Sequence, residues 1–89
     1  MQKVFKYPLP VFTHSEIQMP EGAKILHVAV QAGYPFIWAL VNPDAPLKTR
    51  SFDVYATGHE IINPAFTRKF IGTFFVNGGE FVFHVFETT

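Results

Sequence analysis

Short runs of apolar and β-branched residues alternate with Gly, Pro and Asn along almost the whole chain. Runs of this kind, rich in Val, Ile, Phe, Tyr and Thr, are typical of β-strands. No window shows the 3.6-residue apolar period, closed by capping residues, that indicates a helix. The pattern therefore predicts strands at about 3–7, 11–19, 24–31, 34–41, 50–56, 70–76 and 80–87.

The last two predicted strands form a hairpin, because Gly78 and Gly79 can take the positive φ that a primed turn requires. A two-residue loop at these glycines pairs Asn77 with Glu80. Further from the turn, the same register pairs Phe75 with Val82, Phe74 with Phe83, and Thr73 with His84.

The 24–41 hairpin has two candidate registers around the turn at Ala32 and Gly33. A two-residue loop places His27 opposite Trp38, whereas a three-residue loop with Gly33 in a left-handed bulge places Leu26 there instead. The second register is preferred because it gathers the large side chains on one face. That face would carry Leu26, Val28, Val30, Tyr34, Phe36, Trp38 and Leu40.

In either register, the strands at 34–41 and 80–87 carry apolar residues on both sides. Strands covered on both faces occur in sandwiches, in barrels or against another subunit. We therefore expect an all-β fold, a compact antiparallel barrel or sandwich of six to seven short strands, mostly connected by hairpins. One small domain, 1–89, has little chain to spare for covering such faces, so we also expect a homo-oligomer.

The composition adds limits on the function. Aromatic residues make up 17% of the chain and charged residues 16%, against a usual charged share of about 25%. Seven basic and seven acidic side chains balance, which gives no electrostatic footprint for nucleic acid or an anionic membrane. The longest apolar run, 34–41, is too short to span a bilayer, and no signal peptide is visible, so we expect a soluble cytoplasmic protein.

The chain also lacks the residues that most catalytic and metal sites need. Without cysteine it has no disulfide, no thiolate ligand and no cysteine nucleophile. The histidines, His14, His27, His59 and His84, have no paired spacing, and the two serines occur in no recognisable nucleophile motif. We therefore expect no enzyme activity, no cofactor and no metal site.

The 57–69 segment is thirteen residues without a predicted strand, and loops of that length are often functional. It carries the densest polar cluster of the chain: His59, Glu60, Asn63, Arg68 and Lys69. The Thr57-Gly58-His59 sequence is either a structural turn, in which Gly58 supplies positive φ, or an open loop that presents Thr57 and His59 to a ligand.

Two strand positions complete the set of candidate residues. His84 is predicted to lie opposite Thr73, with which it can share a cross-strand hydrogen bond. Trp38 is most simply a core or interface anchor. The candidate ligand- or partner-binding residues are Trp38, Thr57, His59, Arg68, Thr73 and His84.

Five short motifs, in their order and spacing, resemble a family of short proteins of tailed phages and prophages that is catalogued as a domain of unknown function. They are Gly22-Ala23-Lys24-Ile25-Leu26, Trp38-Ala39-Leu40-Val41, Ala56-Thr57-Gly58-His59, Ile71-Gly72-Thr73-Phe74 and Phe83-His84-Val85-Phe86. The opening Lys6-Tyr7-Pro8-Leu9 also fits, so the likeness covers nearly the whole chain. Family members often carry Gly-Thr-Gly-His where this chain has Ala56-Thr57-Gly58-His59, which argues against a phosphate-wrapping loop.

The resemblance implies a phage context, in which small accessory proteins commonly act by binding. We expect a non-enzymatic binding protein in the cytoplasm of the infected bacterial host, which interferes with a host defence protein through an aromatic-rich β surface. One alternative is an oligomeric protein that binds a small signalling nucleotide or metabolite near His59, Arg68 and Trp38, with the 57–69 segment at a subunit boundary. A third is a minor virion or assembly component.

Overall fold

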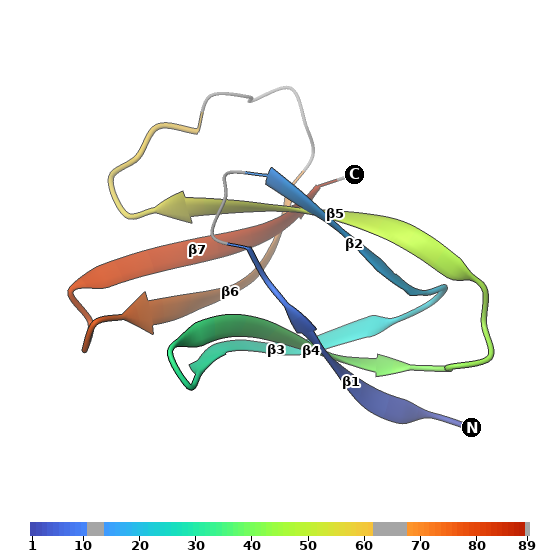
Figure 1. Cartoon of the computed structure of the whole chain (residues 1–89). Helices are drawn as coiled ribbons and strands as arrows, with labels where there is room; N and C mark the ends of the chain where they lie inside the picture. The colour runs from blue at the N-terminus through green and yellow to red at the C-terminus, as the bar shows by residue number, and fades with distance from the viewer. Residues whose placement is uncertain (11–13, 62–67, 89) are drawn as a thin grey trace.

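Seven strands and no helix make up the part of the computed structural model that the structure describes, residues 1–10, 14–61 and 68–88 (Figure 1). All paired strands are antiparallel, which confirms the all-β class. The strands are β1 (Lys3–Pro8), β2 (His14–Pro20), β3 (Lys24–Gln31), β4 (Tyr34–Val41), β5 (Leu47–Ala56), β6 (Arg68–Val76) and β7 (Phe81–Thr88).

The strands lie where the sequence predicts them, and the differences are confined to the first or last residues of individual strands. Strands β3 and β4 have the predicted bounds. Strand β5 begins at Leu47 rather than near residue 50, because the added residues pair with the end of β2. Strand β6 begins at Arg68, so Arg68 and Lys69 are strand residues and not part of a loop. Of the predicted 11–19 strand, residues 11–13 lie outside the described residues.

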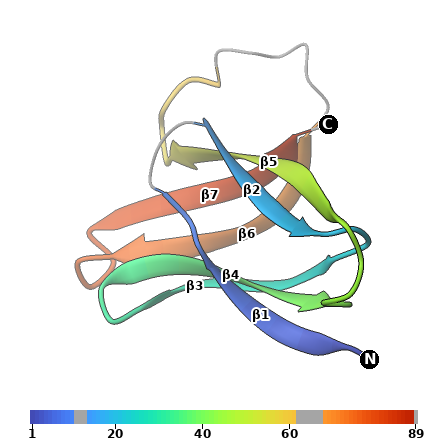
Figure 2. The same cartoon turned by 45° about the vertical axis from the view of Figure 1, so that its right-hand side comes forward.

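The strands form two sheets with the orders β1-β4-β3 and β2-β5-β7-β6. In Figures 1 and 2 the three-stranded sheet lies below the four-stranded one, and the chain crosses between them repeatedly. Among the described strands, β3–β4 and β6–β7 are the consecutive pairs that are sheet neighbours, so the expected preponderance of hairpins is not found. The last five strands form no meander, because β5 pairs with β2 and β7 instead of β4. The fold therefore consists of two packed sheets, and neither sheet closes into a barrel.

The core lies between the two sheets. In β4, alternate residues are buried, as expected for a strand with one face inward. The four-stranded sheet supplies the facing residues from β5, β6 and β7. The largest fully buried side chains are Phe52, Phe74, Leu9, Met19, Ile37, Val41 and Val85.

The register preferred for the β3–β4 hairpin is wrong. The structure pairs His27 with Trp38, which is the register of the two-residue loop. The reason is local, since Ala32 and Gly33 both take positive φ, 52° and 82°, as a primed turn requires. A β-bulge at Leu26 then shifts the register for the first residues of β3.

This register decides which side chains of β4 face the core. Val28 pairs with Ile37 and both are buried, so β3 and β4 contribute β-branched and small residues to the core, opposite the large side chains of the other sheet. Phe36 and Trp38 therefore lie on the outer face of the three-stranded sheet.

The β6–β7 register is confirmed, with Thr73 opposite His84 and Phe75 opposite Val82. Its turn contains positive φ at Asn77, Gly78 and Gly79. A second β-bulge, at Ile71, precedes this regular part of β6.

Candidate functional site

Three of the six candidate residues meet on the outer face of the four-stranded sheet. His84, on β7, lies opposite Thr73 of β6, and Thr57 directly follows β5. The Thr73 Oγ1 atom is 3.0 Å from His84 Nδ1, and the Thr57 Oγ1 atom is 2.7 Å from His84 Nε2. The predicted Thr73–His84 hydrogen bond is confirmed, and both ring nitrogens have a hydroxyl partner.

One assignment of protons satisfies this whole cluster. The Thr57 hydroxyl also lies 3.4 Å from the Val82 carbonyl, to which it can donate. His84 Nε2–H then donates to Thr57 Oγ1, while Nδ1 accepts from the Thr73 hydroxyl. A neutral imidazole therefore satisfies every partner, and the cluster ties the end of β5 to the β6–β7 hairpin.

His59 belongs to the turn that follows this cluster. Its backbone N–H donates to the Ala56 carbonyl at 3.1 Å, and Gly58 takes a φ of 87°. This is the geometry of the structural-turn alternative, in which glycine is favoured at the position of positive φ. The His59 side chain is exposed, and Asn63 lies outside the described residues.

Arg68 belongs to a second polar cluster, centred on the buried carboxylate of Asp53. Arg68 Nε lies 3.3 Å from Asp53 Oδ2, and His14 Nδ1 lies 2.8 Å from Asp53 Oδ1. The Tyr55 hydroxyl is 3.4 Å from both Asp53 Oδ2 and Arg68 Nη2. The Asp53 and Arg68 side chains are only 8% and 10% exposed, so each compensates for the other's loss of water.

Three members of this cluster are not among the candidate residues predicted from the sequence, namely His14, Asp53 and Tyr55. Asp53 carries a usable signal, because it is the only charged residue in the apolar run Phe52-Asp53-Val54-Tyr55. A buried carboxylate needs a cation or several donors, and this rule predicts a partner for it. The identity of the partners could not be predicted, since β2 and β6 reach Asp53 only through the sheet topology.

Trp38 lies on the other side of the molecule, on the outer face of the three-stranded sheet. It continues a row of rings along β4, in which the ring centroids of Tyr34 and Phe36 are 5.7 Å apart and those of Phe36 and Trp38 are 6.0 Å apart. Lys6 Nζ lies 4.5 Å from the Phe36 centroid. We call this surface the aromatic face, and it includes Val4, Lys6, Lys24, His27, Tyr34, Phe36, Trp38 and Leu40.

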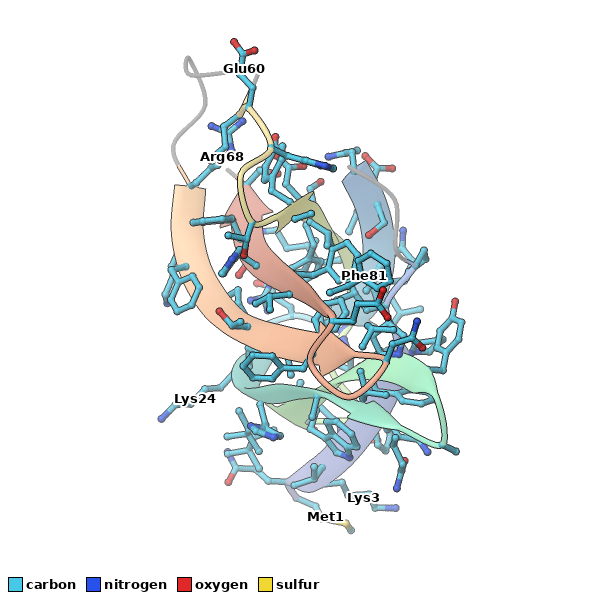
Figure 3. The ribbon with its side chains drawn as sticks, turned by 90° about the vertical axis from the view of Figure 1, so that its left-hand side faces the viewer. Met1, Lys3, Lys24, Glu60, Arg68 and Phe81 are labelled. Atoms are coloured by element: carbon cyan, nitrogen blue, oxygen red, sulfur yellow. The ribbon has the colours of Figure 1, made fainter. Side chains whose placement is uncertain are left out.

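The candidate residues thus fall into separate places rather than one pocket. Figure 3 shows Arg68 and Glu60 at one end of the molecule, with Met1 and Lys3, near β1, at the other. His59, Arg68 and Trp38 do not surround a common space within one chain, because Arg68 and Trp38 occupy the outer faces of different sheets.

Residues 1–10, 14–61 and 68–88 lack two further features. No three His, Cys, Asp or Glu side chains of these segments are grouped to hold a metal ion. The same segments contain no helix with the length and apolar character needed to cross a membrane.

These features define an antiparallel two-sheet domain with two satisfied polar clusters and a partly exposed row of aromatic rings. Over residues 1–89 the chain matches the family described as "Domain of unknown function (DUF7352)", and it belongs to that family. No curated protein and no solved structure matches the chain. The expected membership in a family of unknown function is confirmed, and the function has to be argued from the geometry.

Proposed function

We propose that this chain is a non-enzymatic binding protein that docks on a partner protein through its aromatic face. The observation that carries the proposal is the row Tyr34, Phe36 and Trp38 on a sheet face that no described element covers. Tyr34 and Val4 are 45% and 55% exposed. Contiguous exposed apolar surface marks interaction sites, and Trp and Tyr are the usual anchors of binding energy.

The charges on this face favour a foreign partner with acidic residues. Lys6 and Lys24, which pair with Trp38 and Leu40, are the lysines of the face, and the face contains no carboxylate. A second copy docked by the same face would offer Lys6 no carboxylate there, whereas an apolar surface rimmed by Asp or Glu would complement it. The resemblance to phage proteins supports a host protein as that partner, and interference with a host defence is the role we propose.

The polar clusters support a binding function over a catalytic one. His84 already engages Thr57 and Thr73, and Asp53 already engages His14 and Arg68. Groups that satisfy one another in this way hold strands together and leave little free capacity for a substrate.

The proposal is tested by capture from host lysate followed by a direct binding measurement with the purified captured protein. Trp38→Ser should weaken binding by about 100-fold, as expected for a central aromatic anchor. Lys6→Glu should weaken it by about tenfold, because it places a carboxylate against an acidic rim. Phe75→Ser is the matched control, since Phe75 is an exposed ring on the other sheet. Recovery of no partner, or equal loss for the Trp38 and Phe75 variants, would contradict the proposal.

Self-association, expected from the sequence, stays a prediction. Light scattering of the purified chain at micromolar concentration tests it, and a strict monomer would contradict it. A dimer that Trp38→Ser dissociates would assign the aromatic face to a second copy and so overturn the foreign partner.

A further inference from the structure

The two sheets part along the seam between the edge strands β3 and β6. These strands touch at Val28 and Gly72. Toward the first residues of both strands, a cleft of about 320 Å³ opens between them. Figure 3 shows Lys24 reaching outward from the three-stranded sheet below β6. The lining consists of Ala23, Lys24, Ile25, Leu26, Arg50, Lys69, Phe70, Ile71 and Glu87.

Both strands that line the cleft are irregular at the cleft itself. The register of β3 shifts at Leu26, and the register of β6 shifts at Ile71. These are the two bulges in the described strand pairs, and both bulged residues belong to the lining. Bulges bend an edge strand and redirect its side chains, and they are enriched beside functional sites.

The lining is cationic although the chain as a whole is neutral. Three of the seven basic residues line the cleft, Lys24, Arg50 and Lys69, with Glu87 as the only acid among them. Arg50 is held by Glu87, with 2.9 Å between Nη2 and Oε1, and it also donates to the Ala23 carbonyl. The hydrogen bond from Arg50 to Glu87 raises the pKa of Arg50, against the opposing effect of burial.

The Arg50–Glu87 pair is neutral, so Lys24 and Lys69 supply the net charge of the cleft. Both side chains are exposed, and neither is in an ion pair with another described residue. Two lysines on opposite walls are suited to hold one group with two negative charges, such as a phosphate.

The walls between these charges are apolar. Leu26 is 48% exposed and Phe70 is 57% exposed, which is unusual for large side chains next to a core. Phe70 alternates with Lys69 along the edge strand β6, and its ring packs against Phe86 at a centroid distance of 5.7 Å and an angle of 64°. A ring held in this way is a stacking platform for a flat ligand group.

We propose that the seam cleft binds a nucleoside phosphate, with the phosphate between Lys24 and Lys69 and the base on Phe70. The paired cations select the phosphate, and the exposed ring beside them selects a flat group attached to it. The site shares Lys24 with the aromatic face, whereas Lys69 and Phe70 lie on the other sheet, so their variants test the site independently of the partner binding proposed above.

Calorimetric titration of the full chain with ADP at low salt tests this site. ADP should bind, and Lys24→Gln with Lys69→Gln should weaken it by at least about tenfold, because both charge-assisted contacts are lost. The control is Lys3→Gln with Lys6→Gln, which removes the same charge elsewhere and should leave the affinity within about twofold. No binding of ADP, or the same loss in the control, would overturn the proposal.

Two other ligands and one substitution test each part of the assignment. Pyrophosphate should bind more weakly than ADP because it lacks the base, and adenosine should bind more weakly because it lacks the phosphates. Phe70→Ala should reduce the affinity for ADP and leave that for pyrophosphate unchanged. Equal binding of pyrophosphate and ADP would overturn the stacking on Phe70, and equal binding of adenosine and ADP would overturn the role of the lysines.

Amide chemical-shift changes on adding ADP should centre on Lys24, Leu26 and Phe70, and changes confined to other strands would place the ligand elsewhere.

Discussion

Gly72 and Val28 are in direct contact across the two sheets, and a Cβ atom added to Gly72 would lie 2.5 Å from Val28 Cγ1. No real Cβ tolerates that approach, so Gly72→Ala must displace the Val28 side chain or push β6 away from β3. We expect a loss of about 1–3 kcal/mol in the free energy of unfolding, the usual cost of overpacking a core. Thermal unfolding should show a fall of at least about 4 °C in the melting temperature.

A second variant separates this contact from other effects of the added methyl group. Val28→Ala removes the Cγ1 atom that the new Cβ would meet, at the cost of a small cavity. The loss in the double variant should therefore be smaller than the sum of the two single losses by about 0.5 kcal/mol or more. Additive losses would show that the two residues do not constrain each other.

Asp53 is expected to stabilise the fold through its contacts with Arg68 and His14. Asp53→Asn leaves Arg68 without a carboxylate in a place where its side chain is only 10% exposed. Breaking one side of such a pair costs about 3–5 kcal/mol, and urea unfolding should show a loss near the lower end of this range. The control is Glu16→Gln, since the Glu16 side chain is 64% exposed and 4.0 Å from His14, so the loss should stay below about 0.5 kcal/mol. Similar losses in both variants would contradict a structural role for the buried carboxylate.

Local turn chemistry explains which parts of the fold could be predicted from the sequence. The β6–β7 register follows from Gly78 and Gly79, because the turn residues alone decide it. The β3–β4 register expected from the sequence was wrong, because it rested on gathering the large side chains on one face, whereas the turn at Ala32 and Gly33 sets the pairing of His27 with Trp38. The space beside β6 is instead narrow at Gly72, where Val28 fits and a larger residue does not.

Sheet order and the candidate sites depend on contacts between distant segments, and these contacts have no local signal. The pairing of β5 with β2 and β7, in place of β4, brings His14 and Arg68 to Asp53. The Thr73–His84 bond was predictable because it lies within one hairpin. Thr57 joins the pair only because β5 runs beside β7.

Thr57 and Thr73 both form hydrogen bonds with His84, and their different exposure predicts different losses of stability when either hydroxyl is removed. Thr73→Val should cost about 0.5–1.5 kcal/mol, the net value of one hydrogen bond in a partly buried place. Thr57→Val should cost less, because Thr57 is exposed and water can replace its hydroxyl at His84. Urea unfolding of both variants measures which substitution costs more stability. A larger loss for Thr57→Val would mean that the turn after β5 depends on this hydroxyl more than its exposure indicates.

The ionisation of Tyr7 should make the stability of the fold depend on pH in the alkaline range. Partial burial of its phenol against the core raises the pKa of Tyr7 above the usual 10.0, because the phenolate is the form that loses most from leaving water. The folded state therefore holds this proton more tightly than the unfolded state. The resulting stability is fully present below pH 10 and is lost as the pH rises through the raised pKa. Melting temperatures of the wild type should fall over this range more steeply than those of Tyr7→Phe, which has no proton to lose. Parallel curves for the two proteins would show that the buried phenol does not cause the fall.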